Sequence, residues 1–114
     1  MTRHDDTVAL RHMLDHAEET ILIAQGRSRN DLDRDRLLAL SLIKLVEIIG
    51  EAAGRVSTKV KDSYPGIPWK QIVGTRNRLI HGYDEIDYDV LWRIISIELA
   101  PLVKQIQEIL ISIP

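Results

Sequence analysis

The sequence predicts an all-α fold. Apolar residues recur at spacings of three and four along most of the 114 residues, which is the period of an amphipathic helix. Only four prolines and six glycines interrupt this pattern, so the helices should be few and long. Leu, Ile, Val and Ala dominate the apolar residues and Phe is absent, a composition that suits helix packing. We therefore expect an antiparallel bundle of three long helices and one shorter helix.

The length and composition predict a single domain over residues 1–114. Hydrophobic residues make up 45% of the chain, which argues against intrinsic disorder. The net charge of −2 argues against nucleic-acid binding over the whole surface, so any RNA contact should be a local basic site. The chain has no cysteine, which excludes disulfides and thiolate metal sites and agrees with a cytoplasmic location.

No targeting or membrane segment is expected. The N-terminal residues 1–6 are too charged for a secretory signal. The longest apolar runs are far too short to cross a bilayer. These features favour a cytoplasmic protein without a membrane partner.

The first helix is expected over residues 5–26. Gly26 is a plausible C-terminal stop. His12 and His16 lie four residues apart, a spacing that can hold a metal ion, but no third ligand is obvious. We interpret them as surface histidines and expect neither a metal site nor a cofactor. The apolar stripe comprises Leu10, Leu14, Ala17, Ile21 and Ala24.

The second helix is expected from Asp33 or Arg34 to Val56. It is apolar over much of its circumference, which indicates a central helix covered on several sides. Small residues between Gly50 and Gly54 would let another backbone approach closely. That backbone could belong to the bundle itself or to a second copy of the chain, and the first interpretation is favoured.

A break is expected over residues 57–68, where Tyr64-Pro65-Gly66 is a turn signal. A shorter third helix should follow from Trp69 to Ile80 or His81, with Gly82 as its stop. Gly74 is a weak point inside this helix.

The last helix is expected over residues 88–111. Asp87 is a natural N-cap for it. Pro101 cannot donate a hydrogen bond to the carbonyl of Ile97, so we expect a kink there. The acidic residues around Asp87 could focus a basic site, contact a partner or only cap the helix, and capping is the favoured role of Asp87.

The candidate functional site is the segment RNRLIHGY, residues 76–83, at the end of the third helix. Arg76 and Arg78 supply permanent forked donors that match a phosphate. Asn77 could orient a neighbouring side chain or bind a phosphate. His81 can exchange a proton near neutral pH. Tyr83 carries a hydroxyl that can donate, accept or be modified. The combination indicates a phosphate-handling site.

The spacing of Arg76 and His81 raises a geometric problem. On an ideal helix two residues five apart diverge by about 140°. One chain could bring both groups to one phosphate only if the helix end unwound at Gly82. A symmetric homodimer offers another solution, because two facing copies would line one cleft with two His and two Arg side chains.

Two imidazoles would suit metal-independent RNA cleavage. One could remove the proton of the 2′-hydroxyl nucleophile, and the other could protonate the departing 5′-oxygen. Arg76 could stabilise the charge that develops on the phosphate oxygens. A purely structural interpretation is also open, in which the arginines and His81 only cap a helix.

The motif resembles that of HEPN domains, which carry R-x4-6-H with a polar residue directly after the Arg, here Asn77. With Tyr83 it resembles the R-x4-H-x-Y motif of HepT-type ribonuclease toxins. The segment EIIGEAA at residues 47–53 is similar to the second-helix signature of that family, and Ile67-Pro68-Trp69 and Trp92 match it too. The resemblance covers nearly the whole chain.

The resemblance implies a HEPN helical bundle that forms homodimers, with Arg76 and His81 as the catalytic pair of a metal-independent endoribonuclease and Asn77 and Arg78 as auxiliary RNA-binding residues. It also implies a toxin–antitoxin pair. The antitoxin would be a MntA-like minimal nucleotidyltransferase that silences the toxin by transferring AMP to Tyr83. Two rivals remain: a non-catalytic HEPN module that binds a nucleotidyltransferase or its substrate, and a plain helical dimerisation protein.

Overall fold

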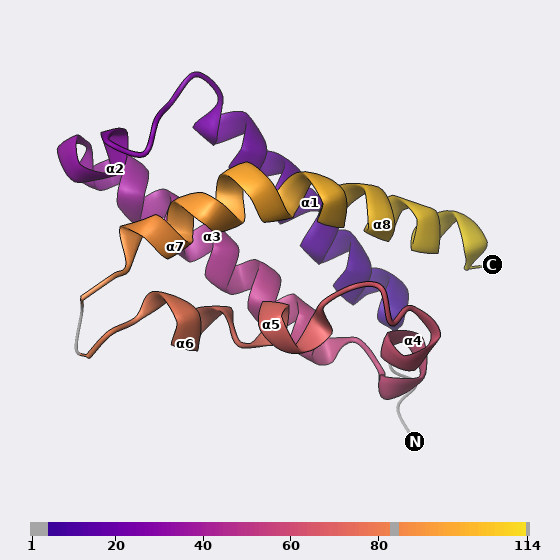
Figure 1. Cartoon of the computed structure of the whole chain (residues 1–114). Coiled ribbons are helices and arrows are strands. Elements are labelled where there is room, and N and C mark those ends of the chain that lie inside the picture. The colour runs from indigo at the N-terminus through magenta and orange to yellow at the C-terminus, as the bar shows by residue number, and fades with distance from the viewer. Residues whose placement is uncertain (1–4, 83–84, 114) are drawn as a thin grey trace.

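The all-α prediction is confirmed by the computed structural model, which describes residues 5–82 and 85–113 (Figure 1). Within these ranges the secondary structure is helical apart from connections and one isolated bridge. Two long helices come first, and the last is one continuous rod of three segments. In chain order they are α1 (Asp6–Ala24), α3 (Arg36–Arg55), and the rod α7 (Tyr88–Arg93), η1 (Ile94–Glu98) and α8 (Leu99–Ser112).

In the described part of the chain, four short helices connect the long ones. Their bounds are α2 (Asp31–Arg34), α4 (Thr58–Ser63), α5 (Trp69–Val73) and α6 (Thr75–Leu79). In Figure 1, α5 lies across the lower end of α3, and α6 lies below α7. Both short helices contact α3, and α6 also contacts α7. The segment that carries the candidate site is therefore held between two long helices.

The core lies where α1, α3 and α8 meet. α1 and α3 run antiparallel, and α8 crosses them (Figure 1). No helix in the described part of the chain is long and apolar enough to cross a membrane. The fully buried aliphatic side chains at this junction include Leu10, Met13, Leu42, Val46, Ile106 and Ile109.

The first helix follows the prediction closely, whereas the start of the second does not. α1 ends before Gly26, whose φ of 75° is the left-handed conformation that favours glycine. Asp35 adopts an extended conformation and caps α3, because its carboxylate accepts from Leu38 N–H at 3.0 Å. The residues before it, Asp31–Arg34, form the separate helix α2, so the predicted start at Asp33 or Arg34 was wrong.

The break predicted over residues 57–68 contains the short helix α4, which the sequence pattern does not predict. Ser57 caps α4, with its hydroxyl accepting from Val60 N–H at 3.3 Å. The same hydroxyl donates to Asp6 in α1 at 2.8 Å. The short helix is thus fixed by a contact with Asp6, near the N-terminal end of the chain. Local periodicity does not reveal a contact between residues so far apart in sequence.

The third helix is divided in two at Gly74, where the sequence predicted one continuous helix with a weak point. Gly74 has φ −84° and ψ 12°, outside the helical range. Beside it, the Thr75 hydroxyl donates to the carbonyl of Ile72 at 2.6 Å. A residue of poor helix propensity next to a side chain that binds the preceding turn explains the division.

The last helix continues through Pro101, and its irregularity lies upstream of the predicted kink. Residues Ile94–Glu98 are π-helical, and Leu99 N–H donates to the carbonyl of Ile94. Such π-turns inside α-helices often occur at functional sites. The residue at the end of this segment, Glu98, binds the candidate site.

Gly50 is where α3 meets α5. A Cβ atom at Gly50 would lie 2.9 Å from the carbonyl oxygen of Ile72, a distance that requires the backbone to move. The close approach is therefore within the chain at Gly50, as the favoured interpretation held. At Gly54 nothing lies within 4 Å of such a Cβ atom.

Replacing Gly50 with alanine should lower the free energy of unfolding. Overpacking typically costs about 1–3 kcal/mol, and the better helix propensity of alanine returns only about 0.5–1 kcal/mol. We expect a net loss of about 1–2 kcal/mol, measured by urea denaturation at one fixed protein concentration. The matched control is Gly54→Ala in the same helix, which should stabilise the protein by about 0.5–1 kcal/mol. Equal effects from the two substitutions would contradict the close contact.

Candidate active site

The motif spans the end of α6 and the turn that follows it. α6 ends at Leu79, and Ile80 is extended with φ −101° and ψ 123°. The helix therefore unwinds before His81, two residues earlier than the expected stop at Gly82, which has φ 85°. The angle of about 140° expected for Arg76 and His81 on a continuous helix does not apply here.

A short antiparallel pairing fixes the backbone around His81. Its N–H donates to the carbonyl of Glu85 at 2.8 Å, and Asp87 N–H donates to the carbonyl of Leu79 at 2.7 Å. Ile80 and Ile86 form the bridge between these two bonds. The pairing brings the residues just before α7 alongside the residues just after α6.

Asp87 lies against the imidazole of His81. Its Oδ2 is 3.0 Å from His81 Nε2, and its Oδ1 accepts from Val90 N–H at 3.0 Å. The hydrogen bond from Val90 N–H is the main cause that lowers the pKa of Asp87 below its ordinary value, and the hydrogen bond with His81 is the next. Asp87 thus remains a carboxylate at neutral pH. The expectation that it caps the last helix is confirmed, and the contact with His81 is additional.

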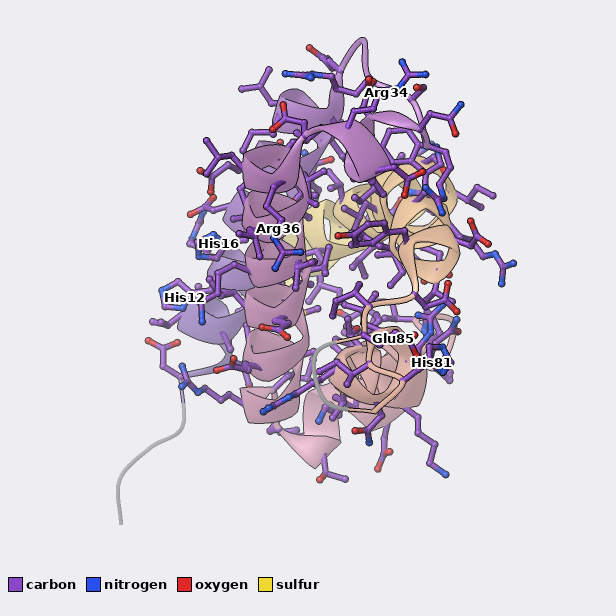
Figure 2. All side chains as sticks on the ribbon, turned by 90° about the vertical axis from the view of Figure 1, so that its left-hand side faces the viewer. His12, His16, Arg34, Arg36, His81 and Glu85 are labelled. Atoms are coloured by element: carbon purple, nitrogen blue, oxygen red, sulfur yellow. The ribbon has the colours of Figure 1, made fainter. Side chains whose placement is uncertain are left out.

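His81 is open to solvent in this chain, with 59% of its side chain exposed. Figure 2 shows it beside Glu85, at the opposite side of the view from His12 and His16 of α1. Arg76 and Asn77 are also exposed, and within the described residues their side chains make no hydrogen bond or ion pair. The side chains of His81, Arg76 and Asn77 are therefore accessible to a ligand. Those of Arg76 and Asn77 make no bond that holds the fold of the described residues.

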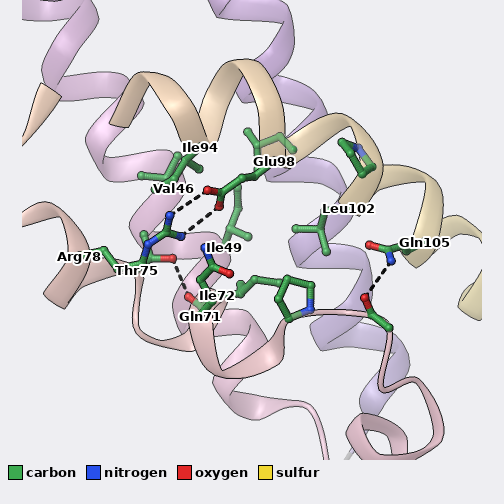
Figure 3. A pocket seen from close by; sticks show the side chains of 14 residues that line it. Val46, Ile49, Gln71, Ile72, Thr75, Arg78, Ile94, Glu98, Leu102 and Gln105 are labelled. Carbon is green, nitrogen blue, oxygen red and sulfur yellow. Dashed lines mark hydrogen bonds and ion pairs between the residues drawn. The ribbon is translucent and has the colours of Figure 1, made fainter. Parts of the chain in front are cut away.

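Arg78 has a partner inside the protein. Its two terminal nitrogens donate to the two carboxylate oxygens of Glu98 at 3.0 and 2.8 Å (Figure 3). The Gln71 amide, turned with its oxygen toward the guanidinium, accepts from the same nitrogens at 3.3 and 3.1 Å. Only 22% of the Arg78 side chain is exposed. Arg78 therefore joins α6 to the end of η1, and an RNA contact from it remains a prediction.

The Arg78–Glu98 pair borders a cavity of about 300 Å³ (Figure 3). The cavity lies between the motif helices α5 and α6 and the rod that contains α8. Its apolar walls include Val46, Ile49, Ile72 and Leu102. The ion pair joins α6 to the rod across this cavity and is one of several contacts between them.

Removing the Arg78 side chain should therefore destabilise the protein. A fully exposed pair contributes about 0–1 kcal/mol and breaking a fully buried pair costs about 3–5 kcal/mol. The partly buried, bidentate pair lies between these limits, so we expect Arg78→Ala to cost about 1–2 kcal/mol. The measurement is urea denaturation of Arg78→Ala, Glu98→Ala and the double variant, which together isolate the coupling energy.

Arg27→Ala is the matched control for this cycle. Arg27 lies 3.6 Å from Asp35, with side chains 43% and 39% exposed. Its loss should cost less than about 1 kcal/mol. Additive effects of Arg78→Ala and Glu98→Ala would show that their contact does not stabilise the fold.

Arg29 makes a further contact with the start of α7. Arg29, in the connection after α1, donates from Nε to Asp89 at 2.6 Å, and its guanidinium lies 5.7 Å from the centre of the Tyr88 ring. The hydrogen bond to Asp89 raises the pKa of Arg29, which stays charged. This contact positions the helix turn that Asp87 caps.

The remaining candidates have structural environments or lie outside the described residues. Tyr83, the predicted site of modification, is outside them. Trp69 is buried and donates from its ring N–H to the carbonyl of Tyr64 at 3.0 Å. Nδ1 of His16 lies 3.5 Å from Glu19. Over residues 5–82 and 85–113 no group of three His, Cys, Asp or Glu side chains could hold a metal ion.

Two residues of the site were not identified from the sequence in these roles. Capping was the favoured role of Asp87, beside a role in focusing the basic site or contacting a partner, and its bond to His81 was not predicted; Glu98 was not singled out. The available signal for Asp87 was its position six residues after His81 across a glycine turn. Glu98 lies twenty residues from Arg78, and no local pattern links them.

The comparisons with known proteins agree with the motif. The model of the family described as ribonuclease HepT-like matches residues 13–109. A protein of Methanocaldococcus jannaschii named "Putative RNase" is 31% identical over 94% of this chain and 98% of its own length. Another of that name, from Caldanaerobacter subterraneus subsp. tengcongensis, is 36% identical over 89% of this chain and 90% of its own length.

A "Probable ribonuclease HepT" of Thermococcus cleftensis is 34% identical over 60% of this chain and 62% of its own length. No solved structure matches the chain significantly. The family match spans α1 to α8 and includes the whole segment from Arg76 to Tyr83. The chain therefore belongs to the HepT-like ribonuclease family.

Proposed function

We propose that the chain is a metal-independent endoribonuclease that works as a homodimer. The observation that carries this proposal is the exposure of Arg76, in the first turn of α6, and of His81, just after that helix. Arg76 has no side-chain bond within the described residues, so its guanidinium is available to a phosphate. Membership in a ribonuclease family supports RNA as the substrate.

The proposed reaction is an internal transesterification. A neutral His81 removes the proton of the 2′-hydroxyl, and the 2′-oxygen forms a bond to the adjacent phosphorus. The bond from phosphorus to the 5′-oxygen breaks, and a protonated His81 supplies the proton to that oxygen. The products are a 2′,3′-cyclic phosphate and a 5′-hydroxyl. Arg76 stabilises the charge on the phosphate oxygens, and Asn77 is an auxiliary phosphate ligand.

A homodimer is proposed because the reaction needs a base and an acid in the same step. One imidazole cannot be base and acid in the same step, whereas a two-fold axis near the motif would place one His81 from each copy in a shared cleft. Two copies of Arg76 would also raise the local positive charge of an otherwise mildly acidic protein, whose net charge is −2.

Silencing by a nucleotidyltransferase antitoxin is part of the proposal. The Tyr83 hydroxyl would attack the α-phosphorus of ATP and release pyrophosphate, which leaves AMP on the tyrosine. The added phosphate charge would stand two residues from His81 and repel RNA. The toxin and its MntA-like partner would act in the cytoplasm.

The test is RNA cleavage by the purified protein in EDTA. We expect cleavage with cyclic-phosphate and 5′-hydroxyl ends, and no cleavage of DNA of the same sequence, because DNA lacks the 2′-hydroxyl. Intact mass shows whether the preparation carries AMP, and Tyr83→Phe provides a preparation that cannot carry it there. A clean, unmodified dimer without cleavage would favour the non-catalytic module. Growth arrest on expression without the partner tests the toxin assignment.

A further inference from the structure

The backbone places Asp87 and His81 at a set separation. Hydrogen bonds of 2.8 and 2.7 Å join His81 N–H to Glu85 and Asp87 N–H to Leu79 on either side of the bridge between Ile80 and Ile86. Asp87 also begins α7, whose first turn is bound to Arg29. The position of Asp87 is therefore fixed by its own backbone hydrogen bond and by the contact that binds the first turn of α7.

The two oxygens of Asp87 have separate partners. Oδ1 accepts from Val90 N–H, and Oδ2 lies 3.0 Å from His81 Nε2. A carboxylate can only accept hydrogen bonds, so His81 Nε2 must carry the proton in this contact. In the neutral imidazole the other nitrogen, Nδ1, then holds the free lone pair.

We propose that Asp87 is a positioning residue that selects Nδ1 of His81 as the reactive nitrogen. The inference rests on the proposed ribonuclease function and assigns to Asp87 a role in it beyond capping α7. Nδ1 of one His81 takes the proton of the 2′-hydroxyl, and Nδ1–H of the partner's His81 gives a proton to the 5′-oxygen. Asp87 itself does not touch RNA.

The site explains why an acidic residue is present where RNA must bind. The side chain of His81 is 59% exposed and that of Asp87 is 28% exposed. An ion pair with this much solvent exposure contributes little to the stability of the fold. Without Asp87, the imidazole would be free to turn about its side-chain bonds and to adopt either tautomer. With Asp87, the ring is oriented and its proton is placed before the substrate arrives, which is the purpose of a preorganised site.

Two substitutions separate the capping role from the positioning role. Serine and asparagine are both good N-caps, so Asp87→Ser and Asp87→Asn should keep the bond to Val90 N–H. Serine leaves His81 without its partner. Asparagine that caps through Oδ1 presents its NH₂ group to Nε2, which favours the opposite tautomer. Asp62→Asn is the matched control, because it removes an exposed carboxylate of α4 that, within the described residues, bonds to neither His81 nor Asp87.

The first measurement is steady-state cleavage of one defined RNA in EDTA by the four dimers, free of AMP. Asp87→Asn and Asp87→Ser should lower kcat by roughly 10²-fold, the low end of the range for general acid–base catalysis. KM should change much less than kcat, because Asp87 does not contact RNA. Asp62→Asn should retain the kcat of the wild type. Melting temperatures close to that of the wild type would exclude a folding defect.

The second measurement is the tautomer of His81 by ¹⁵N NMR at a pH where the ring is neutral, with His81→Gln used to assign its signals. The wild type should carry the proton on Nε2, and Asp87→Asn should shift it toward Nδ1. A wild type protonated on Nδ1, or Asp87 variants with wild-type kcat, would overturn the inference alone. A wild-type dimer that cleaves no RNA would instead overturn the proposed function and this role with it.

Discussion

Replacing His81 with alanine is expected to lower kcat for RNA cleavage by roughly 10²–10⁴-fold, the usual contribution of a general acid or base. Among the described residues, His81 is the only imidazole that the fold places at the motif, since His12 and His16 lie on α1 at the opposite side of the view in Figure 2. The His81 side chain is exposed and, within the described residues, bonds only to Asp87, so the variant should fold normally. The measurement is cleavage of a defined RNA in EDTA.

His12→Ala is the matched control and should leave kcat unchanged. His12 is exposed on α1, and its ring lies 6.3 Å from that of His16. If every variant, including His81→Ala, kept the same RNase activity, the activity would come from a contaminating nuclease.

A mixed dimer sharpens the same prediction. One wild-type subunit and one His81→Ala subunit, purified through two different tags, retain one imidazole. If each subunit worked alone, the mixed dimer would keep about half of the activity. If one cleft needs both histidines, the mixed dimer loses either the base or the acid, and its activity should fall below about one tenth. Retention of half would refute the shared cleft and leave His81 as a catalytic residue of separate sites.

Replacing Arg76 with alanine is expected to lower kcat by roughly 10²–10³-fold, the usual loss when a donor to the developing charge is removed. Arg76 is exposed and its side chain bonds to no other described residue, so the free energy of unfolding should stay within about 0.5 kcal/mol of the wild type. Arg76→Lys keeps the charge but loses the planar fork and should recover only part of the activity. Single-turnover cleavage and urea denaturation measure the two quantities.

Two controls distinguish this role from general electrostatics. Arg93→Ala removes an exposed arginine from α7 and should have little effect on kcat. Arg78→Ala tests the neighbour that binds Glu98, and its main effect should be on stability. If Arg76→Ala and Arg93→Ala lowered activity equally, Arg76 would contribute only to the overall field that attracts RNA.

Much of the fold was predictable because helices are local. The stripe that begins at Leu10 predicted α1, and the pattern of residues 37–56 predicted α3, since each depends on neighbours three and four positions away. The errors occur where distant contacts or single residues change the outcome. α4 is held by Asp6, α6 is separated from α5 at Gly74, and the rod becomes π-helical before Pro101.

The site was predictable in its chemistry and less so in its geometry. The exposed Arg76 and His81 belong to one short motif, which could be recognised without coordinates. The pairing of His81 with Asp87 depends on a turn that reverses the chain after Ile80, and that of Arg78 with Glu98 depends on how α6 meets the rod. Loop geometry and helix docking are collective results of packing, so no residue spacing encodes them directly.

The sequence by itself determined that this chain is helical and that it carries the motif of its ribonuclease family, because periodicity and residue chemistry are properties of short segments. Tertiary structure alone decided the partners of the motif. It gave Asp87, the cap of α7, a second role as the neighbour of His81, and it directed Arg78 toward Glu98. Both outcomes have the same physical reason: hydrogen-bond distances between residues six and twenty positions apart are set only when the intervening chain has folded.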